Sequence, residues 1–125
     1  MDTGLKVLIV DDQKTMRRII RNLLTQIGFS KIEEAEDGGQ AFEMVKSHKD
    51  FGLIISDWNM EPITGLQFLK NLRGSEFDFK NLPFIMITAE SKTENVVAAK
   101  QAGVSNYIVK PFNAETLRAK IEAIL

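Results

Sequence analysis

The chain has 125 residues, 44% of them hydrophobic, which suits one domain with a single core and leaves no room for a second of ordinary size. Asp and Glu total 17 against 16 Lys and Arg, so the net charge of -1 offers no basic field for a phosphate backbone, and we expect no direct nucleic-acid binding. Cysteine is absent and His48 is the single histidine, which excludes disulfides, thiolate metal sites and the usual imidazole-rich zinc site.

The first strand–helix pair is predicted near the N-terminus. Lys6–Val10 is apolar after its first residue, as expected for a strand that is covered on both faces. A helix follows and ends at Gly28, a residue that adopts the left-handed cap conformation at low cost. Its apolar residues recur at spacings of three and four, which places them on one stripe: Met16, Ile19, Ile20, Leu23, Leu24 and Ile27. The polar residues of this helix are expected to face water: Arg17, Arg18, Arg21 and Asn22.

Four more strand–helix pairs follow in chain order, and this alternation is typical of a parallel α/β sheet. The predicted strands are Ile32–Ala35, Leu53–Ser56, Phe84–Ile87 and Tyr107–Val109. The helices are expected after Asp37-Gly38-Gly39, around Leu66–Leu72, over Lys92–Ala102 with Gly103 as its end, and around Leu117–Ile124. The second strand is short and acidic, which favours an edge position. Because a helix crosses over between each strand and the next and returns the chain to the same edge, all five strands run in parallel and their carboxyl ends lie together.

Four of these apolar runs end in reactive polar residues. In chain order they are Asp11-Asp12, Ser56-Asp57, Thr88 and Lys110. Open parallel sheets bind ligands just beyond the carboxyl ends of their strands, at the point where the winding direction reverses. Several carboxylates gathered there would repel one another without a counter-ion, and oxygen-only ligands suit Mg²⁺ better than zinc or copper. The sequence therefore predicts a site for Mg²⁺ and a phosphoryl group.

The acidic residues leave two interpretations open. Asp11-Asp12 could be metal ligands, or could cap the following helix, a position that Asp fills well. Asp57 is harder to explain structurally, because a carboxylate at the end of a buried strand is costly without a partner. Aspartate can attack phosphorus and form an aspartyl phosphate. Lys110 would then add a positive charge near the phosphoryl oxygens, and the Thr88 hydroxyl would donate a hydrogen bond to them.

These residues resemble a known family. The motifs Asp11-Asp12, Asp57, Thr88-Ala89 and Lys110-Pro111-Phe112 are similar to those of the receiver domain of two-component response regulators, over residues 1–125. Within that family the segments Thr15–Leu24, Glu33–Gly38, Asp57–Met60 and Thr88–Glu90 resemble the single-domain chemotaxis regulators. The resemblance implies an α/β fold with a flavodoxin-like, doubly wound, five-stranded parallel sheet of order 2-1-3-4-5 and five helices in a single domain.

The resemblance also implies chemical roles. Asp57 would accept a phosphoryl group from a phosphohistidine of a sensor histidine kinase. The expected Mg²⁺ ligands are Asp11, Asp12, Asp57 and the backbone carbonyl of Asn59. The expected contacts of the phosphoryl oxygens are Thr88, Lys110 and the amide of Ala89. Asn59 and Glu90 would border the path of the attacking water and tune the loss of phosphate.

A further implied group of residues would transmit the signal. Thr88 would move toward the phosphoryl group and let Tyr107 rotate inward, and the output face would comprise Val96, Tyr107 and Lys120. On sequence alone, Tyr107 could instead be an edge aromatic residue and Val96 an ordinary core residue. The Lys110-Pro111 bond is expected to be cis, as in related receivers. One departure is Met60-Glu61-Pro62, since related chains place Pro directly after this Met, and it leaves the shape of the loop and its partner contacts open.

The sequence predicts a phosphorylation-activated signalling switch that is not an enzyme beyond self-phosphorylation and slow self-dephosphorylation. The absence of an output domain favours action through partners: a chemotaxis-type sensor histidine kinase, the flagellar motor switch protein and a phosphatase. A stand-alone receiver that serves as a phosphorelay intermediate or phosphate sink is the alternative. A Mg²⁺-dependent phosphatase is disfavoured, since such enzymes usually carry a second Asp where this chain has Asn59. With no secretory signal and no apolar run of spanning length, we expect a cytoplasmic monomer without membrane contact.

Overall fold

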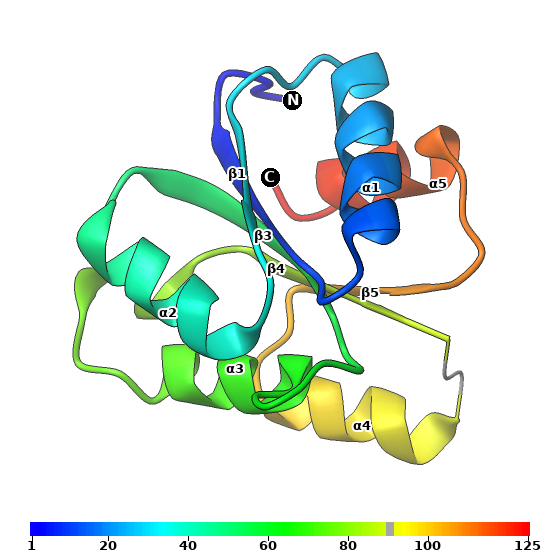
Figure 1. Ribbon diagram of the computed structural model, residues 1–125. Coiled ribbons are helices and arrows are strands. Elements are labelled where there is room, and N and C mark those ends of the chain that lie inside the picture. The colour runs from blue at the N-terminus through cyan, green and yellow to red at the C-terminus, as the bar shows by residue number, and fades with distance from the viewer. Residues whose placement is uncertain (90–91) are drawn as a thin grey trace.

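Five parallel strands form one sheet with helices on both faces (Figure 1). The computed structural model describes residues 1–89 and 92–125. The strands are β1 (Lys6–Val10), β2 (Ile32–Ala35), β3 (Phe51–Asp57), β4 (Phe84–Thr88) and β5 (Asn106–Val109). The helices are α1 (Lys14–Ile27), α2 (Gly38–Ser47), α3 (Gly65–Arg73), α4 (Thr93–Gln101) and α5 (Ala114–Glu122). The strand order is β2-β1-β3-β4-β5, which confirms the predicted topology.

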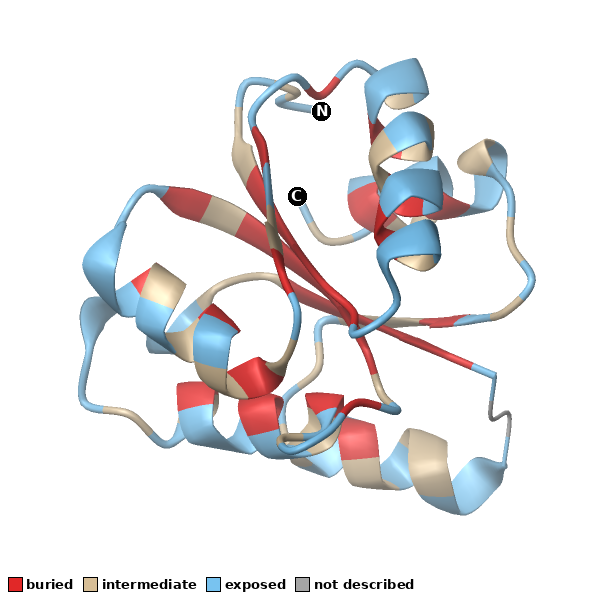
Figure 2. Ribbon diagram, in the orientation of Figure 1, coloured by how far each residue is buried: buried red, intermediate tan, exposed pale blue. Residues whose placement is uncertain are grey.

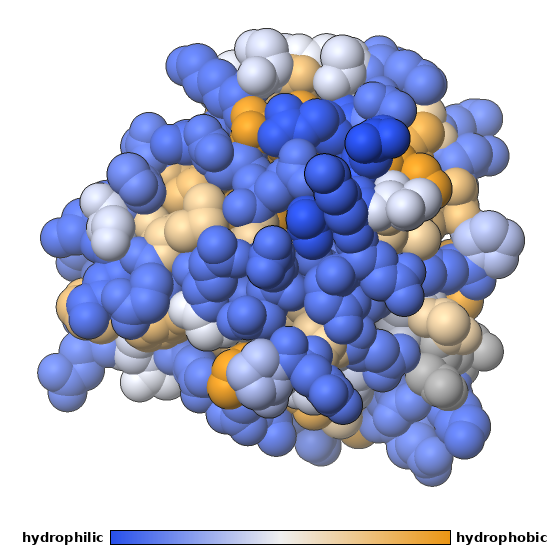
Figure 3. Space-filling model, viewed as in Figure 1, coloured by the Kyte–Doolittle hydropathy of each residue, from blue (hydrophilic) through white to orange (hydrophobic). Residues whose placement is uncertain are grey.

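The sheet separates two hydrophobic layers. Successive side chains of a strand point to opposite faces, so Val7 and Ile9 pack with α1 and α5, whereas Leu8 and Val10 pack with α2 and α3. Figure 2 shows the buried residues concentrated along the central strands and on the inward sides of the helices. The visible surface is mostly hydrophilic with small scattered apolar areas (Figure 3). Within the described residues, no helix has the length and apolar character needed to cross a bilayer.

The register brings the carboxyl ends of the strands together. Val10 pairs with Ala35 of β2 and with Ser56 of β3, while Thr88 of β4 pairs with Val109 of β5. From β1 the chain crosses to β2 on one side and then returns to β3 on the other, so the winding direction reverses between β1 and β3. The residues that follow β1 and β3 therefore lie at the position where this class of sheet binds ligands.

Several boundaries differ from the prediction. β3 begins at Phe51 instead of Leu53, because Phe51 pairs with Lys6 across a register irregularity that follows Lys6. Gly52 interrupts the apolar run there, which hid this part of the strand from the sequence pattern. A short 3₁₀ helix, η1 (Asp78–Asn81), was not predicted. The predicted cap at Gly28 is confirmed by its φ of 125°.

Candidate functional site

Three carboxylates converge at the switch point between β1 and β3. Asp11 follows β1, Asp57 ends β3, and Asp12 lies beside them at the surface. Each offers an oxygen, and these oxygens all lie within 4.8 Å of one another. Asp11 is 1% exposed and Asp57 is 6% exposed, so two of the three charges are held away from water. Burial of like charges at this spacing is unfavourable unless a cation compensates them.

The Asp11 carboxylate is only half satisfied. Its Oδ1 accepts a hydrogen bond from the Gln13 amide at 2.9 Å, but its buried Oδ2 has no hydrogen-bond partner among the described residues. Burial raises the pKa of Asp11 to about 6, with a further contribution from the charge of Asp57. Helix α1 starts after its N-cap residue Gln13, whose own side chain makes no capping hydrogen bond. Neither Asp11 nor Asp12 occupies the N-cap position of α1, and the Asp11 carboxylate instead accepts from the amide of the N-cap residue.

Lys110 supplies the cationic side of the site. Its Nζ lies 3.1 Å from Oδ1 of Asp57, and both side chains are largely shielded from solvent. Burial raises the pKa of Asp57, while the Lys110 ammonium acts in the opposite direction. The Lys110 amide donates to the Thr88 carbonyl at 2.8 Å, which fixes the start of the β5–α5 loop against β4. The Lys110–Pro111 peptide bond is cis, as expected from the resemblance.

The residues after β4 complete this edge of the sheet. Thr88 is fully buried, and Ala89 follows it at the surface. Thr88 and Lys110 are adjacent through the backbone hydrogen bond between them, so a hydroxyl and an ammonium lie at neighbouring strand ends. Glu90, expected to tune the loss of phosphate, lies outside the described residues.

The β3–α3 loop forms the outer wall of the site. Asn59 is exposed, and a cavity of about 320 Å³ is lined by Asp12, Asn59, Met60, Glu61 and Thr64. The Glu61–Pro62 bond of the Met60-Glu61-Pro62 segment is cis. The opening lies directly beside the acidic cluster, since Asp12 belongs to both.

Gly65 closes this loop, and its role is not predicted by the sequence analysis. Its amide donates to the Trp58 carbonyl at 2.9 Å, and a Cβ at this position would collide with the Asp57 carbonyl oxygen. Only glycine permits this approach of α3 to the end of β3. The signal available in the sequence was a glycine placed eight residues after Asp57, at the start of an amphipathic helix.

The donor set fits a hard divalent cation. Three carboxylates supply oxygen ligands, and the unpartnered Oδ2 of Asp11 is a buried acceptor that a cation could satisfy. Oxygen ligands in this number suit Mg²⁺, which retains several waters and takes further oxygens from a phosphoryl group.

The expected output residues lie on α4, β5 and α5, and all are partly buried. Tyr107 pairs with Met86 of β4 and packs against the core layer under α2 and α3. Val96 is half-buried on α4, and the carbonyl of Lys120 on α5 accepts from Asn106 Nδ2 at 3.0 Å. Partial burial of Tyr107 and Val96 is compatible with both interpretations of these residues.

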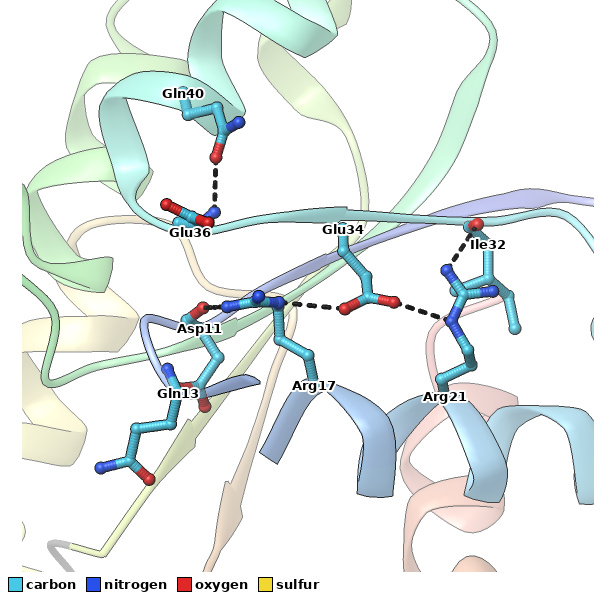
Figure 4. Close-up of polar contacts among 8 residues, drawn as sticks. All are labelled: Asp11, Gln13, Arg17, Arg21, Ile32, Glu34, Glu36 and Gln40. Carbon is cyan, nitrogen blue, oxygen red and sulfur yellow. Dashed lines mark hydrogen bonds and ion pairs between the residues drawn. The ribbon is translucent and has the colours of Figure 1, made fainter. Parts of the chain in front are cut away.

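A second charged cluster, made of Arg17, Arg21 and Glu34, adjoins Asp11 (Figure 4). Arg17 was expected to face water but is 9% exposed, so that prediction is wrong. Its Nε lies 3.0 Å from Oε1 of Glu34, and its Nη1 donates to the Asp11 carbonyl at 2.7 Å. Arg21 Nε lies 2.8 Å from Oε2 of the same Glu34. The spacing of Arg17 to the buried Ile20 and Leu24 was the sequence signal that could have revealed its burial.

Comparison with known proteins identifies the family. Residues 7–122 match the family described as the response regulator receiver domain. The chain belongs to this family. The receiver domain is 49% identical over 124 residues to chemotaxis protein CheY-3 of Vibrio cholerae, with 99% of this chain and 94% of that protein covered. It is 48% identical over 120 residues to chemotaxis protein CheY of Pseudomonas aeruginosa, with 96% and 95% covered.

Solved structures agree with this assignment. CheY4 of Vibrio cholerae superposes on the receiver domain with a TM-score of 0.88 at 35% identity, covering 98% of this chain and 99% of that one. The response regulator TrrA of Thermotoga maritima, solved in complex with Mg²⁺ and BeF, gives a TM-score of 0.83 at 29% identity, with 97% and 99% covered. The CheX–CheY–BeF₃–Mg²⁺ complex of Borrelia burgdorferi gives 0.88 at 30% identity, with 96% and 88% covered.

Proposed function

We propose that this receiver domain is a phosphorylation-activated switch in which Asp57 accepts a phosphoryl group from a chemotaxis-type sensor histidine kinase. The observation that carries the proposal is the Lys110 ammonium 3.1 Å from the Asp57 carboxylate, beside two further aspartates. A purely structural ion pair would not need Asp11 and Asp12 next to it, because they weaken the pairing and raise the cost of burial.

The residues divide the chemistry among them. A carboxylate oxygen of Asp57 attacks phosphorus as the bond from phosphorus to the donor nitrogen breaks, which leaves an acyl phosphate. Asp11, Asp12, Asp57 and the Asn59 carbonyl hold Mg²⁺. When bound, the ion neutralises charge on the phosphoryl oxygens and on the acidic cluster.

Other residues bind the transferred group and control its lifetime. Lys110 places its positive charge at the phosphoryl oxygens, and the Thr88 hydroxyl and Ala89 amide donate hydrogen bonds to them. Asn59 and Glu90 tune the entry of water and hence the slow self-dephosphorylation. External substrates are not turned over.

The switch acts through a partner in the cytoplasm. Phosphorylation favours the state in which Thr88 and Tyr107 reposition, and the face formed by Val96, Tyr107 and Lys120 then binds the flagellar motor switch protein. The likeness to chemotaxis proteins over nearly the whole chain supports this partner over a phosphorelay or phosphate-sink role. A phosphatase is a further proposed partner, and the CheX complex of the Borrelia relative supports the idea that a protein of this kind binds a second protein.

Phosphoryl transfer is tested with acetyl phosphate and Mg²⁺. Mass spectrometry should show one phosphate on the wild-type chain and none on Asp57→Asn. Unchanged incorporation in Asp57→Asn would exclude Asp57 as the acceptor. A pull-down with beryllium fluoride and Mg²⁺ then tests the partner: motor switch protein should be retained only with the mimic, and retention that ignores the mimic would argue against the motor assignment.

A further inference from the structure

Arg17 is a buried cation in the first turn of α1. It is 9% exposed and lies on the inward side of the helix with Ile20 and Leu24. An arginine is seldom buried without a full set of partners, because its charge is costly to desolvate. The identity of its partners therefore indicates what its burial achieves.

One partner is the backbone of a proposed metal ligand. Arg17 Nη1 donates to the Asp11 carbonyl at 2.7 Å, inside the protein. The amide of Asp11 donates in turn to the Ala35 carbonyl of β2 at 3.1 Å. Both backbone polar groups of Asp11 are thus held, one by β2 and the other by Arg17. These two bonds leave the peptide planes on both sides of Asp11 little freedom, and they fix the direction in which its carboxylate leaves the chain.

The other partner holds the guanidinium in place. Glu34 lies on β2 and contacts Arg17 through one carboxylate oxygen and Arg21 through the other (Figure 4). Arg21 also donates to the Ile32 carbonyl at 3.1 Å. A guanidinium held at two points by hydrogen bonds loses its freedom to rotate, so Glu34 orients the Nη1 of Arg17 toward Asp11.

We propose that Arg17, oriented by Glu34, is a positioning residue that fixes Asp11 for binding of Mg²⁺ at the acidic cluster. The proposal rests on the function proposed above and adds a residue that contacts neither the metal nor the phosphoryl group. Groups that orient the ligands of a metal typically contribute a factor of ~10 to 100 to its affinity. Because Arg17 acts on the Asp11 backbone and not on its carboxylate, we expect the low end of that range.

A matched pair of variants separates positioning from general support of the fold. Arg17 and Arg21 share Glu34, but of these two arginines only Arg17 hydrogen-bonds to Asp11 in the part of the chain that the structure describes. Arg17→Met should weaken Mg²⁺ binding about tenfold by calorimetry, whereas Arg21→Met should change it less than twofold. Equal losses in both variants, or none in Arg17→Met, would overturn the proposal.

A second measurement needs no metal. The Gln13 amide donates to the Asp11 carboxylate, so its hydrogen exchange reports on the position of that side chain. Exchange at Gln13 should accelerate in Arg17→Met and not in Arg21→Met, and equal rates in the two would contradict the proposal. If the wild-type chain bound no Mg²⁺, the proposed function itself would fail, while Gln13 exchange would still decide whether Arg17 orders Asp11.

A second pair of variants tests the proposal even if Arg17→Met does not fold. Glu34→Gln weakens the hold on Arg17, and Glu33→Gln alters its exposed neighbour on the same strand. Mg²⁺ binding should weaken in Glu34→Gln and stay unchanged in Glu33→Gln. Equal affinities in these two variants would count against the role of Glu34 in orienting Arg17.

Discussion

Two charged clusters meet at Asp11 and differ in how far their polar groups are paired. On the side of β3, three carboxylates face one ammonium, and a buried oxygen of Asp11 has no partner among the described residues. On the side of β2, Glu34 is shared by two guanidinium groups, and Arg17 also reaches a backbone carbonyl. The first cluster is the one that we propose receives a cation and a phosphoryl group. The charges of the second cluster are paired with one another, and we propose that this cluster supports the position of Asp11.

The largest expected effect is on phosphoryl transfer at the first cluster, which contains Asp11, Asp12, Asp57 and Lys110. Lys110→Met removes the cation that faces Asp57, and we expect phosphorylation by acetyl phosphate to slow by roughly 100-fold or more, the usual cost of losing a charged or hydrogen-bonding group at a transition state. Stopped-flow measurement of Trp58 fluorescence would follow the reaction. Lys100→Met, at an exposed position of α4, is the control and should react at the wild-type rate. Equal rates in the two variants would remove Lys110 from the mechanism.

The next largest effect is on the free energy of unfolding, through the second cluster of Arg17, Arg21 and Glu34. Glu34→Gln removes the charge that holds two arginines, and we expect it to lower the free energy of unfolding by about 2 kcal/mol, as is usual for hydrogen bonds to charged groups. Urea unfolding would measure the loss. Glu33→Gln should stay within about 0.5 kcal/mol of wild type, because Glu33 is exposed. A loss no larger than that of Glu33→Gln would show that the second cluster does not support the fold.

The contrast between the two clusters also explains what sequence reasoning could predict. The end of each strand follows from where an apolar run stops, so Asp57 and Lys110 could be placed at one edge from the sequence, and the 3.1 Å contact between them agrees with that placement. The burial of Arg17 depends on Glu34, which lies 17 residues further along on a strand. The packing that brings β2 beside α1 cannot be predicted from the sequence around either residue. The approach of Gly65 to Asp57 depends on packing in the same way.

Neutralising a charge in the first cluster, that of Asp11, Asp12, Asp57 and Lys110, should have the opposite effect on stability to neutralising Glu34. Asp11→Asn removes a buried like charge, and an amide nitrogen in place of the unpartnered oxygen can donate to a neighbouring carboxylate. Without Mg²⁺ we expect unfolding to cost about 1 kcal/mol more than in wild type. With Mg²⁺ the order should reverse, because only the wild type gains stability from binding the ion. Thermal melts with and without Mg²⁺ would measure both. A lower melting temperature of metal-free Asp11→Asn would contradict the view that the charge of Asp11 destabilises the metal-free protein.

The smallest effect is the pH dependence of the second cluster. Burial acts to raise the pKa of Glu34, but the hydrogen bonds and charges of Arg21 and Arg17 outweigh it and hold this pKa below its ordinary value of 4.5. The folded protein therefore binds this proton less tightly than the unfolded chain does, so the stability due to Glu34 is fully present above pH 4.5 and is lost as the pH falls through the folded-state pKa. The stability difference between wild type and Glu34→Gln should accordingly shrink in acid. A gap that stays constant below pH 4.5 would mean that the charge of Glu34 contributes nothing to the cluster.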